Sequence, residues 1–352
     1  MRYININDAK QTFILEEDIY DKNGLLLVSK GSALSEDIIQ KIKTTDFNIV
    51  AVSEASGSEE ALSTEETPQE SEAMSADDKG FMVNILKVTV ANIKLLGKDY
   101  FSPVKPIALE CVNEITQYEQ AVSLLYKLSK IDGYTINHSI RVGLLSALIS
   151  YWEESPVERI KQSFLAGLFS QVGKLGVPKS LILKTDPLSE DELKVIKSYT
   201  LYSDEFLKDL PFIDDEISIA ILQSTEKLNG SGYPMGLRGT QISYLAQIVG
   251  VSNIFDAAIN NKCYRSAISP FKIAAELFDD SIEQLSPKAT IPLVKAIQSC
   301  FIGMKVELSN GETGEVVYMN KIDPTRPMVK VNDTIYDLSM GKEKLSITRM
   351  LL

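Results

Sequence analysis

The sequence predicts a mainly α-helical protein, with a small α/β module before the helices and a short β-rich extension after them. Apolar residues recur at helical spacing through most of residues 80–302. Strand-like runs next to turn pairs occur before residue 53 and after residue 302. The chain has 352 residues, 44% of them apolar, which is enough for a sizeable core and more than one folding unit.

Residues 1–52 are predicted to form the α/β module. The apolar run at 25–28 follows an Asn-Gly turn pair, and residues 47–52 alternate like a strand. Ser35 is placed to cap a helix between these two runs. A module of this size has a thin core.

Residues 53–79 are predicted to be an acidic disordered linker. Residues 53–78 hold nine acidic residues and no Lys, Arg or aromatic residue. Such a segment buries too little apolar surface to offset the entropy of ordering. It supplies −9 of the net charge of −12, so the folded parts are nearly neutral. A solvated spacer and a regulatory segment both fit this composition.

Residues 80–302 are predicted to form a helical bundle. Ser189 with Glu192 makes a capping box, and a Ser-Pro pair at 269–270 and another at 286–287 mark two further helix starts. Residues 140–151 are apolar nearly all round, as in a helix at the centre of a bundle.

Residues 303–352 are predicted to form a small β-rich extension. Short runs of Val, Leu, Ile and Tyr flank an Asn-Gly turn pair at 310–311 and follow two prolines. A role in closing the fold or supporting a dimer is the simplest hypothesis for it.

Composition excludes several classes of protein. With 36 basic and 48 acidic residues, bulk nucleic-acid binding is disfavoured. Three cysteines far apart in sequence indicate reduced thiols and neither a disulfide scaffold nor a zinc ribbon. No apolar run reaches the length of a membrane span, and the first residues lack the apolar region of a signal peptide. We expect a cytoplasmic bacterial protein.

Three motifs carry the functional prediction. They are Tyr-Thr-Ile-Asn-His-Ser at 134–139, Val-Gly-Lys-Leu-Gly-Val-Pro at 172–178, and Asn-Gly-Ser-Gly-Tyr-Pro at 229–234. Their order and spacing resemble the HD-GYP family of metal-dependent cyclic di-GMP phosphodiesterases. The resemblance continues through Phe-Asp-Ala at 255–257 and Tyr-Arg at 264–265, and covers about residues 85–300.

The resemblance implies an HD-type bundle whose helices hold two or three divalent ions, yet most ligand positions are changed here. Only His138 is retained; the other positions hold Ser170, Gln171, Tyr199, Ser224, Thr225 and Asn253. Hydroxyls and amides are weak ligands for transition ions. The sequence therefore predicts a degenerate domain with no metal, no cofactor and no catalytic residues, and a protein that is not an enzyme. The replacements can hydrogen-bond one another without charge.

Two retained side chains leave alternatives open. His138 is interpreted as a satisfied core histidine, with a ligand role as the alternative. Lys174 either lies beside the site, as in the family, or is a solvated helix-end residue. The glycines and proline of 229–234 are expected to set a tight loop shape.

The preferred hypothesis is a non-catalytic signalling or adaptor protein that acts through a protein partner in cyclic di-GMP-related signalling and can also bind the nucleotide. The candidate nucleotide contacts are Lys174, Lys227, Tyr233, Arg238, Lys262 and Arg265. The position where the family offers Arg is Gln247 here, which counts against binding. The alternatives are a phosphodiesterase with a divergent or mononuclear site, and a purely structural interaction module. A homodimer is compatible with each.

Overall fold

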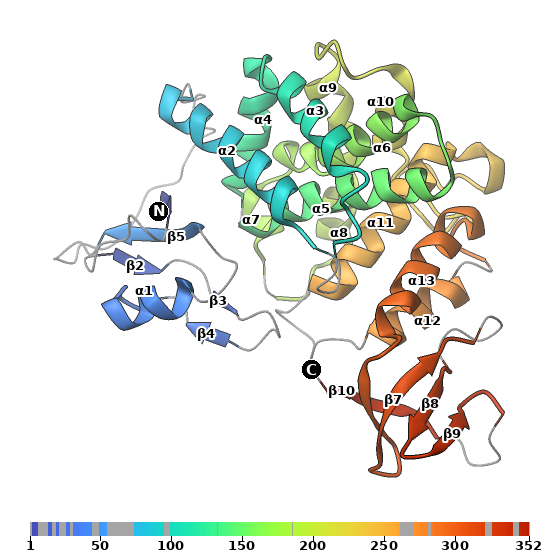
Figure 1. The fold of residues 1–352 in the computed structure, drawn as a ribbon. Coiled ribbons are helices and arrows are strands. Elements are labelled where there is room, and N and C mark those ends of the chain that lie inside the picture. Colours follow the sequence, from blue (N-terminus) through green and yellow to red (C-terminus); the bar gives the residue numbers. More distant parts are fainter. Residues whose placement is uncertain are drawn as a thin grey trace. The chain divides into compact units, whose positions relative to one another are not determined.

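The protein is described by a computed structural model (Figure 1). The chain divides into two compact units, Met1–Ala73 and Met74–Leu352. Most of the predicted linker lies outside the described residues, but its last residues belong to a helix that begins at Ala76. The described residues are 2–5, 13–15, 19–20, 26–28, 31–43, 49–54, 74–94, 99–131, 133–184, 186–260, 270–280, 283–320, 326–340 and 345–351.

The first unit is an α/β module, as the sequence predicts. Its sheet has the order β1 (Arg2–Asn5), β5 (Ile49–Glu54), β2 (Phe13–Leu15), all antiparallel. β3 (Ile19–Tyr20) pairs with β4 (Leu26–Val28). The helix α1 (Glu36–Lys43) starts after Ser35, whose hydroxyl accepts a hydrogen bond from the Ile38 amide. The small core consists of Phe13, Leu15, Val28, Leu34, Ile42 and Val52.

The second unit is a helical bundle followed by a sheet (Figure 1). A mainly α fold is therefore confirmed. Among the described residues, no helix combines the length and the apolar character needed to cross a membrane. The helices are α2 (Ala76–Asn92), α3 (Lys105–Ile115), α4 (Glu119–Ser129), α5 (Gly133–Trp152), α6 (Val157–Phe169), η2 (Val172–Gly176), α7 (Lys179–Ile182), α8 (Glu190–Lys197), α9 (Tyr199–Leu207), α10 (Asp215–Leu222), η3 (Gly239–Gln241), α11 (Tyr244–Asn260), α12 (Pro270–Asp280) and α13 (Pro287–Phe301).

Capping side chains fix several helix starts. The predicted capping box is present: the Ser189 hydroxyl accepts from the Glu192 amide, and the Glu192 carboxylate accepts from the Ser189 amide. Asp214 caps α10 by accepting from the Ile217 amide. α13 begins with Pro287 at its first position, where a missing N–H costs nothing.

The central helices α5 and α6 pack unusually closely. A Cβ added to Gly167 would lie 2.6 Å from the Cα of Gly143, so both helices need glycine at their crossing. The predicted apolar segment at 140–151 lies inside α5, and nearly all of its side chains are buried. α5 also packs on α11, and this contact brings together the polar residues described below.

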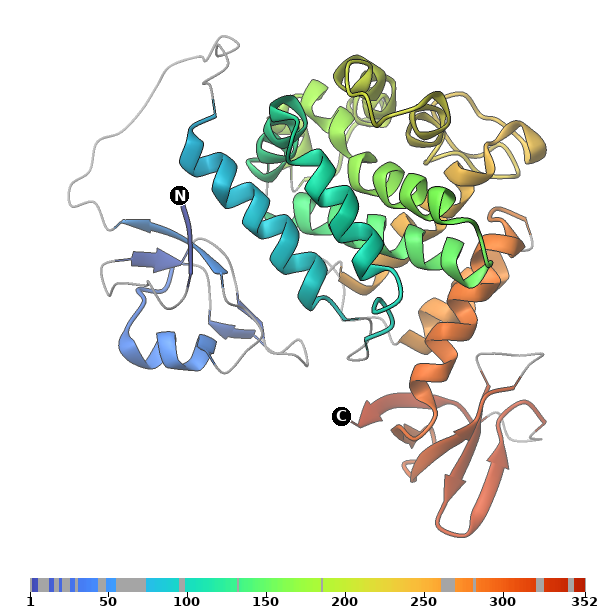
Figure 2. The same cartoon turned by 45° about the horizontal axis from the view of Figure 1, so that its top comes forward.

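The chain passes from α13 into a five-stranded antiparallel sheet (Figure 2). Its order is β10-β6-β7-β8-β9, so the last strand pairs with the first. The sequence predicts the strands between 303 and 340 but not β10. The strands are β6 (Lys305–Leu308), β7 (Thr313–Tyr318), β8 (Met328–Val331), β9 (Thr334–Asp337) and β10 (Ile347–Leu351).

Candidate functional site

The retained histidine lies between two side chains of α11. His138 is buried on α5, and its Nδ1 is 2.7 Å from Oδ2 of Asp256. Its other ring nitrogen, Nε2, is 2.7 Å from Oδ1 of Asn253. Because an ionised carboxylate only accepts, Nδ1–H donates to Asp256. Both ring nitrogens therefore have a protein partner.

The buried carboxylate of Asp256 is also paired with a cation. Arg141 Nε donates to Oδ1 at 2.6 Å and a terminal guanidinium nitrogen donates to Oδ2 at 3.0 Å. Burial raises the pKa of Asp256, but the hydrogen bond from His138 and the charge of Arg141 outweigh it and hold that pKa below its usual value. Asp256 is thus an ionised carboxylate inside the bundle.

The other predicted metal-site positions carry no charge, and four of them lie close together. Burial raises the pKa of the Tyr199 hydroxyl, and the polar side chains of Gln171 and Ser224 oppose this shift only in part. The Gln171 amide donates to Ser170 Oγ at 3.3 Å. Thr225 Oγ1 instead donates to the carbonyl of Tyr233 at 2.6 Å, in the Gly-Tyr-Pro loop. The structure thus brings Ser170, Gln171, Tyr199 and Ser224 together.

The Gly-Tyr-Pro loop is held by one carboxylate. Glu226 accepts backbone hydrogen bonds from Met235 (2.6 Å), Gly236 (3.1 Å) and Leu237 (3.0 Å). A Cβ at Gly232 would lie 2.4 Å from the Glu226 Cα, so the loop backbone packs directly on this residue. Glu226 therefore holds the segment that follows Pro234, and its backbone packs on the loop at Gly232.

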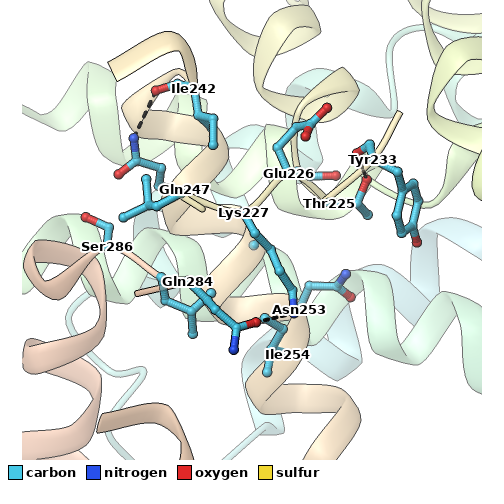
Figure 3. Close-up of a pocket in the computed structure, with 14 residues that line it drawn as sticks. Thr225, Glu226, Lys227, Tyr233, Ile242, Gln247, Asn253, Ile254, Gln284 and Ser286 are labelled. Atoms are coloured by element: carbon cyan, nitrogen blue, oxygen red, sulfur yellow. Dashed lines mark hydrogen bonds between the residues drawn. The ribbon is translucent and has the colours of Figure 1, made fainter. Parts of the chain in front are cut away.

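A cavity of about 190 Å³ lies beside this loop (Figure 3). It opens between the end of α10, the loop, α11 and the segment before α13. The Lys227 ammonium donates to Gln284 Oε1 at 2.6 Å on its wall, and Gln247 donates to the Ile242 carbonyl. The lining residues are Ser224, Thr225, Glu226, Lys227, Leu228, Tyr233, Ile242, Gln247, Gly250, Asn253, Ile254, Gln284, Leu285 and Ser286.

The predicted nucleotide contacts separate into three groups. Lys227 and Tyr233 line the cavity. Lys174 and Arg238 do not: the Lys174 ammonium lies 5.9 Å from the centre of the Tyr199 ring, and Arg238 packs beside Gly230. Lys262 and Arg265 lie outside the described residues.

The sequence interpretation missed Arg141, Gln284 and Ser286. Arg141 could have been found, because it follows His138 by three residues and so lies on the same helix face. Gln284 and Ser286 carry no local signal. They reach the cavity only through the packing of the segment before α13, where the Leu228 amide donates to the Gln284 carbonyl.

The donor set does not fit the divalent ions implied by the resemblance. Among the described residues, no three His, Cys, Asp or Glu side chains lie close enough to hold an ion together. Around His138 the oxygen donors are Asn253 and an aspartate already bound to arginine. Such a set leaves the charge of a divalent ion largely uncompensated.

The comparisons with known proteins identify the bundle. A family model described as HD domain matches residues 135–281. Residues 135–281 are an HD domain. This match contains the His138 and Gly-Tyr-Pro motifs, and together with the relatives below it confirms the resemblance predicted from them. Degeneracy of the HD domain stays a prediction.

Curated relatives are also similar to this chain. The cyclic di-GMP phosphodiesterase PA4108 of Pseudomonas aeruginosa is 28% identical over 64% of this chain and 55% of its own length. PdeB, a cyclic di-GMP phosphodiesterase of Borreliella burgdorferi, is 26% identical over 58% and 54%. The 3'3'-cGAMP-specific phosphodiesterase 3 of Vibrio cholerae is 28% identical over 55% and 40%. The chain thus spans about half the length of the curated relatives it matches, or less.

A solved structure is also similar. Bd1817, described as a HDG"Y"P protein from Bdellovibrio bacteriovorus, covers 84% of this chain and 99% of its own at 17% identity, with a TM-score of 0.45. This likeness is too loose to add to the assignment.

One expectation is corrected by the relatives. The changed ligand positions led to the expectation that the protein is not an enzyme, and the relatives contradict it because they are named as phosphodiesterases. The expectation relied only on aligned ligand positions. The names of these proteins point to hydrolase activity.

Proposed function

We propose that the HD domain binds cyclic di-GMP, with part of the nucleotide in the cavity beside the Gly-Tyr-Pro loop. The single observation that carries the proposal is Lys227, whose ammonium lies on the cavity wall. Relatives of this chain are named as cyclic di-GMP phosphodiesterases, which supports a cyclic dinucleotide as the ligand. A phosphate or a purine acceptor edge needs such a donor. Leu228, Ile254 and Leu285 supply apolar wall for a flat base.

The size of the cavity sets how the nucleotide binds. At about 190 Å³ it is smaller than the roughly 300–1,000 Å³ of sites that enclose a drug-sized ligand. One half of a cyclic dinucleotide therefore enters the cavity, and the other half stays outside it.

Calorimetric titration of the full chain with cyclic di-GMP tests this proposal. Lys227→Met removes a charge-assisted hydrogen bond and should weaken binding by about 10–100-fold. Lys194→Met is the matched control, because Lys194 is exposed on α8 and pairs with the exposed Asp191, three residues earlier. Absence of heat for the unaltered chain at high micromolar concentration, or equal affinities of Lys227→Met and the unaltered chain, would contradict the proposal.

Hydrolysis of the nucleotide is the second candidate function, and the names of the relatives favour it. Chromatography of cyclic di-GMP incubated with the full chain, with and without added Mn²⁺, would detect a linear dinucleotide product. The same assay with 3'3'-cGAMP separates the two substrates for which the relatives are named. Formation of the linear product supports a phosphodiesterase. If the nucleotide stays unchanged, the result supports binding without hydrolysis.

A protein partner, a homodimer and a cytoplasmic location are further parts of the proposal. Action through a protein partner, a homodimer and a cytoplasmic location each follow only from the sequence argument. A pull-down with the full chain, compared with a chain lacking residues 1–73, tests the partner and leaves the second unit whole. A partner retained by both chains would bind the helical and β parts.

A further inference from the structure

Helix α13 begins at the cavity beside the Gly-Tyr-Pro loop, and its start is not capped. Ser286 is the N-cap residue, where a serine hydroxyl usually accepts a hydrogen bond from an amide of the first turn. Here the hydroxyl makes no capping bond, and no other hydrogen bond of it is found among the described residues. Ser286 is buried, with 6% of its surface exposed, and it lines the cavity (Figure 3). Its hydroxyl is therefore available to a ligand in the cavity.

The amides of the first turn of α13 are donors at the same place. The first N–H groups of an α-helix have no acceptor within the helix, and Pro287 has no N–H. The remaining donors of this turn are the amides of Lys288 and Ala289. They point back along the helix axis, toward the segment 284–286 that lines the cavity. Together with the helix dipole, these amides favour a negative charge at the start of α13.

A second hydroxyl near the start of α13 also has no partner. Thr290 is fully buried, and its Oγ1 makes no hydrogen bond in the part of the chain that the structure describes. It follows Ser286 by four residues, so the two lie on one face of the helix. Buried hydroxyls normally have a partner. The pair therefore favours a polar ligand at this helix start.

A cation lies on another wall of the same cavity. Lys227 Nζ donates to Gln284 Oε1 at 2.6 Å (Figure 3). An ammonium has three N–H donors, so this bond leaves two for a ligand. The Gln284 amide donates in turn to Oδ1 of Asp280 at 3.1 Å, which directs its oxygen toward Lys227. Gln284 thus orients the ammonium without cancelling its charge.

Two acidic side chains near the cavity are bound to other groups. Glu226 accepts from three loop amides, and Asp280 accepts from Gln284. Lys288 adds a positive charge at the start of α13, where its ammonium lies 4.1 Å from the centre of the Tyr244 ring. The charges around this helix start therefore favour an anion.

We propose that the first-turn amides of α13, the Ser286 hydroxyl and the Lys227 ammonium form a phosphate subsite, which binds one phosphodiester of a cyclic dinucleotide. Each of these groups can donate a hydrogen bond, and phosphodiester oxygens only accept. A purine edge fits less well because it presents donors as well as acceptors. The nucleotide rests on the proposed function, whereas the binding of phosphate does not.

Ser286→Asp tests the subsite because its effects on stability and on binding are opposite. The new carboxylate would accept from the α13 amides in place of a phosphate, and should raise the Tm of the full chain by about 2–4 °C. It should also weaken cyclic di-GMP binding by about tenfold or more relative to Ser286→Asn, which can cap the helix without a charge. Ser189→Asp is the matched control: Ser189 is the exposed N-cap residue of α8, and the affinity should stay that of the unaltered chain. A lower Tm for Ser286→Asp, or equal affinities of Ser286→Asp and Ser286→Asn, would overturn the subsite.

Inorganic phosphate separates the subsite from the proposed function. At about 50 mM it should raise the Tm of the unaltered chain by about 2–4 °C more than that of Lys227→Met or Ser286→Asp, because general salt effects act on all three chains. Equal rises in the three chains would overturn the subsite. If phosphate acts in this way but the unaltered chain binds no cyclic di-GMP, the proposed function fails and the subsite stands. If the nucleotide binds and the phosphate effect is absent, the subsite fails and the proposed function stands.

Discussion

Glu226 offers the sharpest test of how the loop beside the cavity is held. Its two carboxylate oxygens accept three backbone hydrogen bonds from residues 235–237. Glu226→Gln keeps one oxygen for Met235 and Gly236 but turns an amide N–H₂ toward the Leu237 N–H. One charge-assisted bond worth about 1.5–3 kcal/mol is lost, and the other two weaken because the acceptor is neutral. We expect a loss of about 2–4 kcal/mol in the free energy of unfolding.

Urea denaturation measures this loss, and amide hydrogen exchange locates it. Exchange at Met235, Gly236 and Leu237 should accelerate, because their acceptor is weakened. Glu216→Gln is the matched control: its carboxylate pairs with Arg159 near the surface and should contribute about 0–1 kcal/mol. If Glu226→Gln changes stability by under about 0.5 kcal/mol and leaves exchange at 235–237 unaltered, then the loop does not depend on this carboxylate and the reasoning is refuted.

Two further predictions concern packing and acid stability. Gly167→Ala should lower the free energy of unfolding by about 3 kcal/mol in urea denaturation, because the new Cβ meets the backbone of α5. Gly80→Ala, in open space on α2, should raise the free energy of unfolding by about 0.5–1 kcal/mol. Similar effects at both sites would contradict the close crossing of α5 and α6. The hydrogen bond from Tyr126, helped by that from Ser75, lowers the pKa of Asp78 below its usual 3.8, so its contribution to stability is complete above that pH and is lost as the pH falls through the lower folded value. The Tm difference between Asp78→Asn and the unaltered chain should therefore be present at pH 7 and shrink toward pH 2, and a difference that is constant with pH would refute this assignment.

The helical part of the fold could be predicted because its signals are local. The capping box at Ser189, the proline at the start of α13 and the apolar face around α5 all depend on residues within a turn or two. β10 could not be predicted in this way. Its register is set by pairing with β6, about forty residues earlier, and a strand at a sheet edge carries little signal in its own sequence.

Only those parts of the site that belong to sequence motifs could be predicted. The sequence motifs located His138, Asn253 and the loop at 229–234, and the structure brings them to one side of α11. Motifs say nothing of charge balance, so the ion pair of Arg141 with Asp256 was missed although both residues lie in the predicted helical bundle. Gln284 was missed because its place depends on how the segment before α13 folds back against Leu228.

The HD domain has few side chains that could bind a metal ion, and this limits how it could hydrolyse a nucleotide. Residues 135–281 contain one histidine, and every Asp and Glu in this range is among the described residues. In the same range, the positions outside the described residues add one side chain that binds metals readily, Cys263. Among the described residues, no three His, Cys, Asp or Glu side chains form a group that could hold an ion, so we expect a metal-dependent activity to use further ligands, of which Cys263 is one candidate. Hydrolysis assayed with and without chelator, in the full chain and in Cys263→Ser, separates these routes. Activity that resists chelation would indicate chemistry that uses no bound ion.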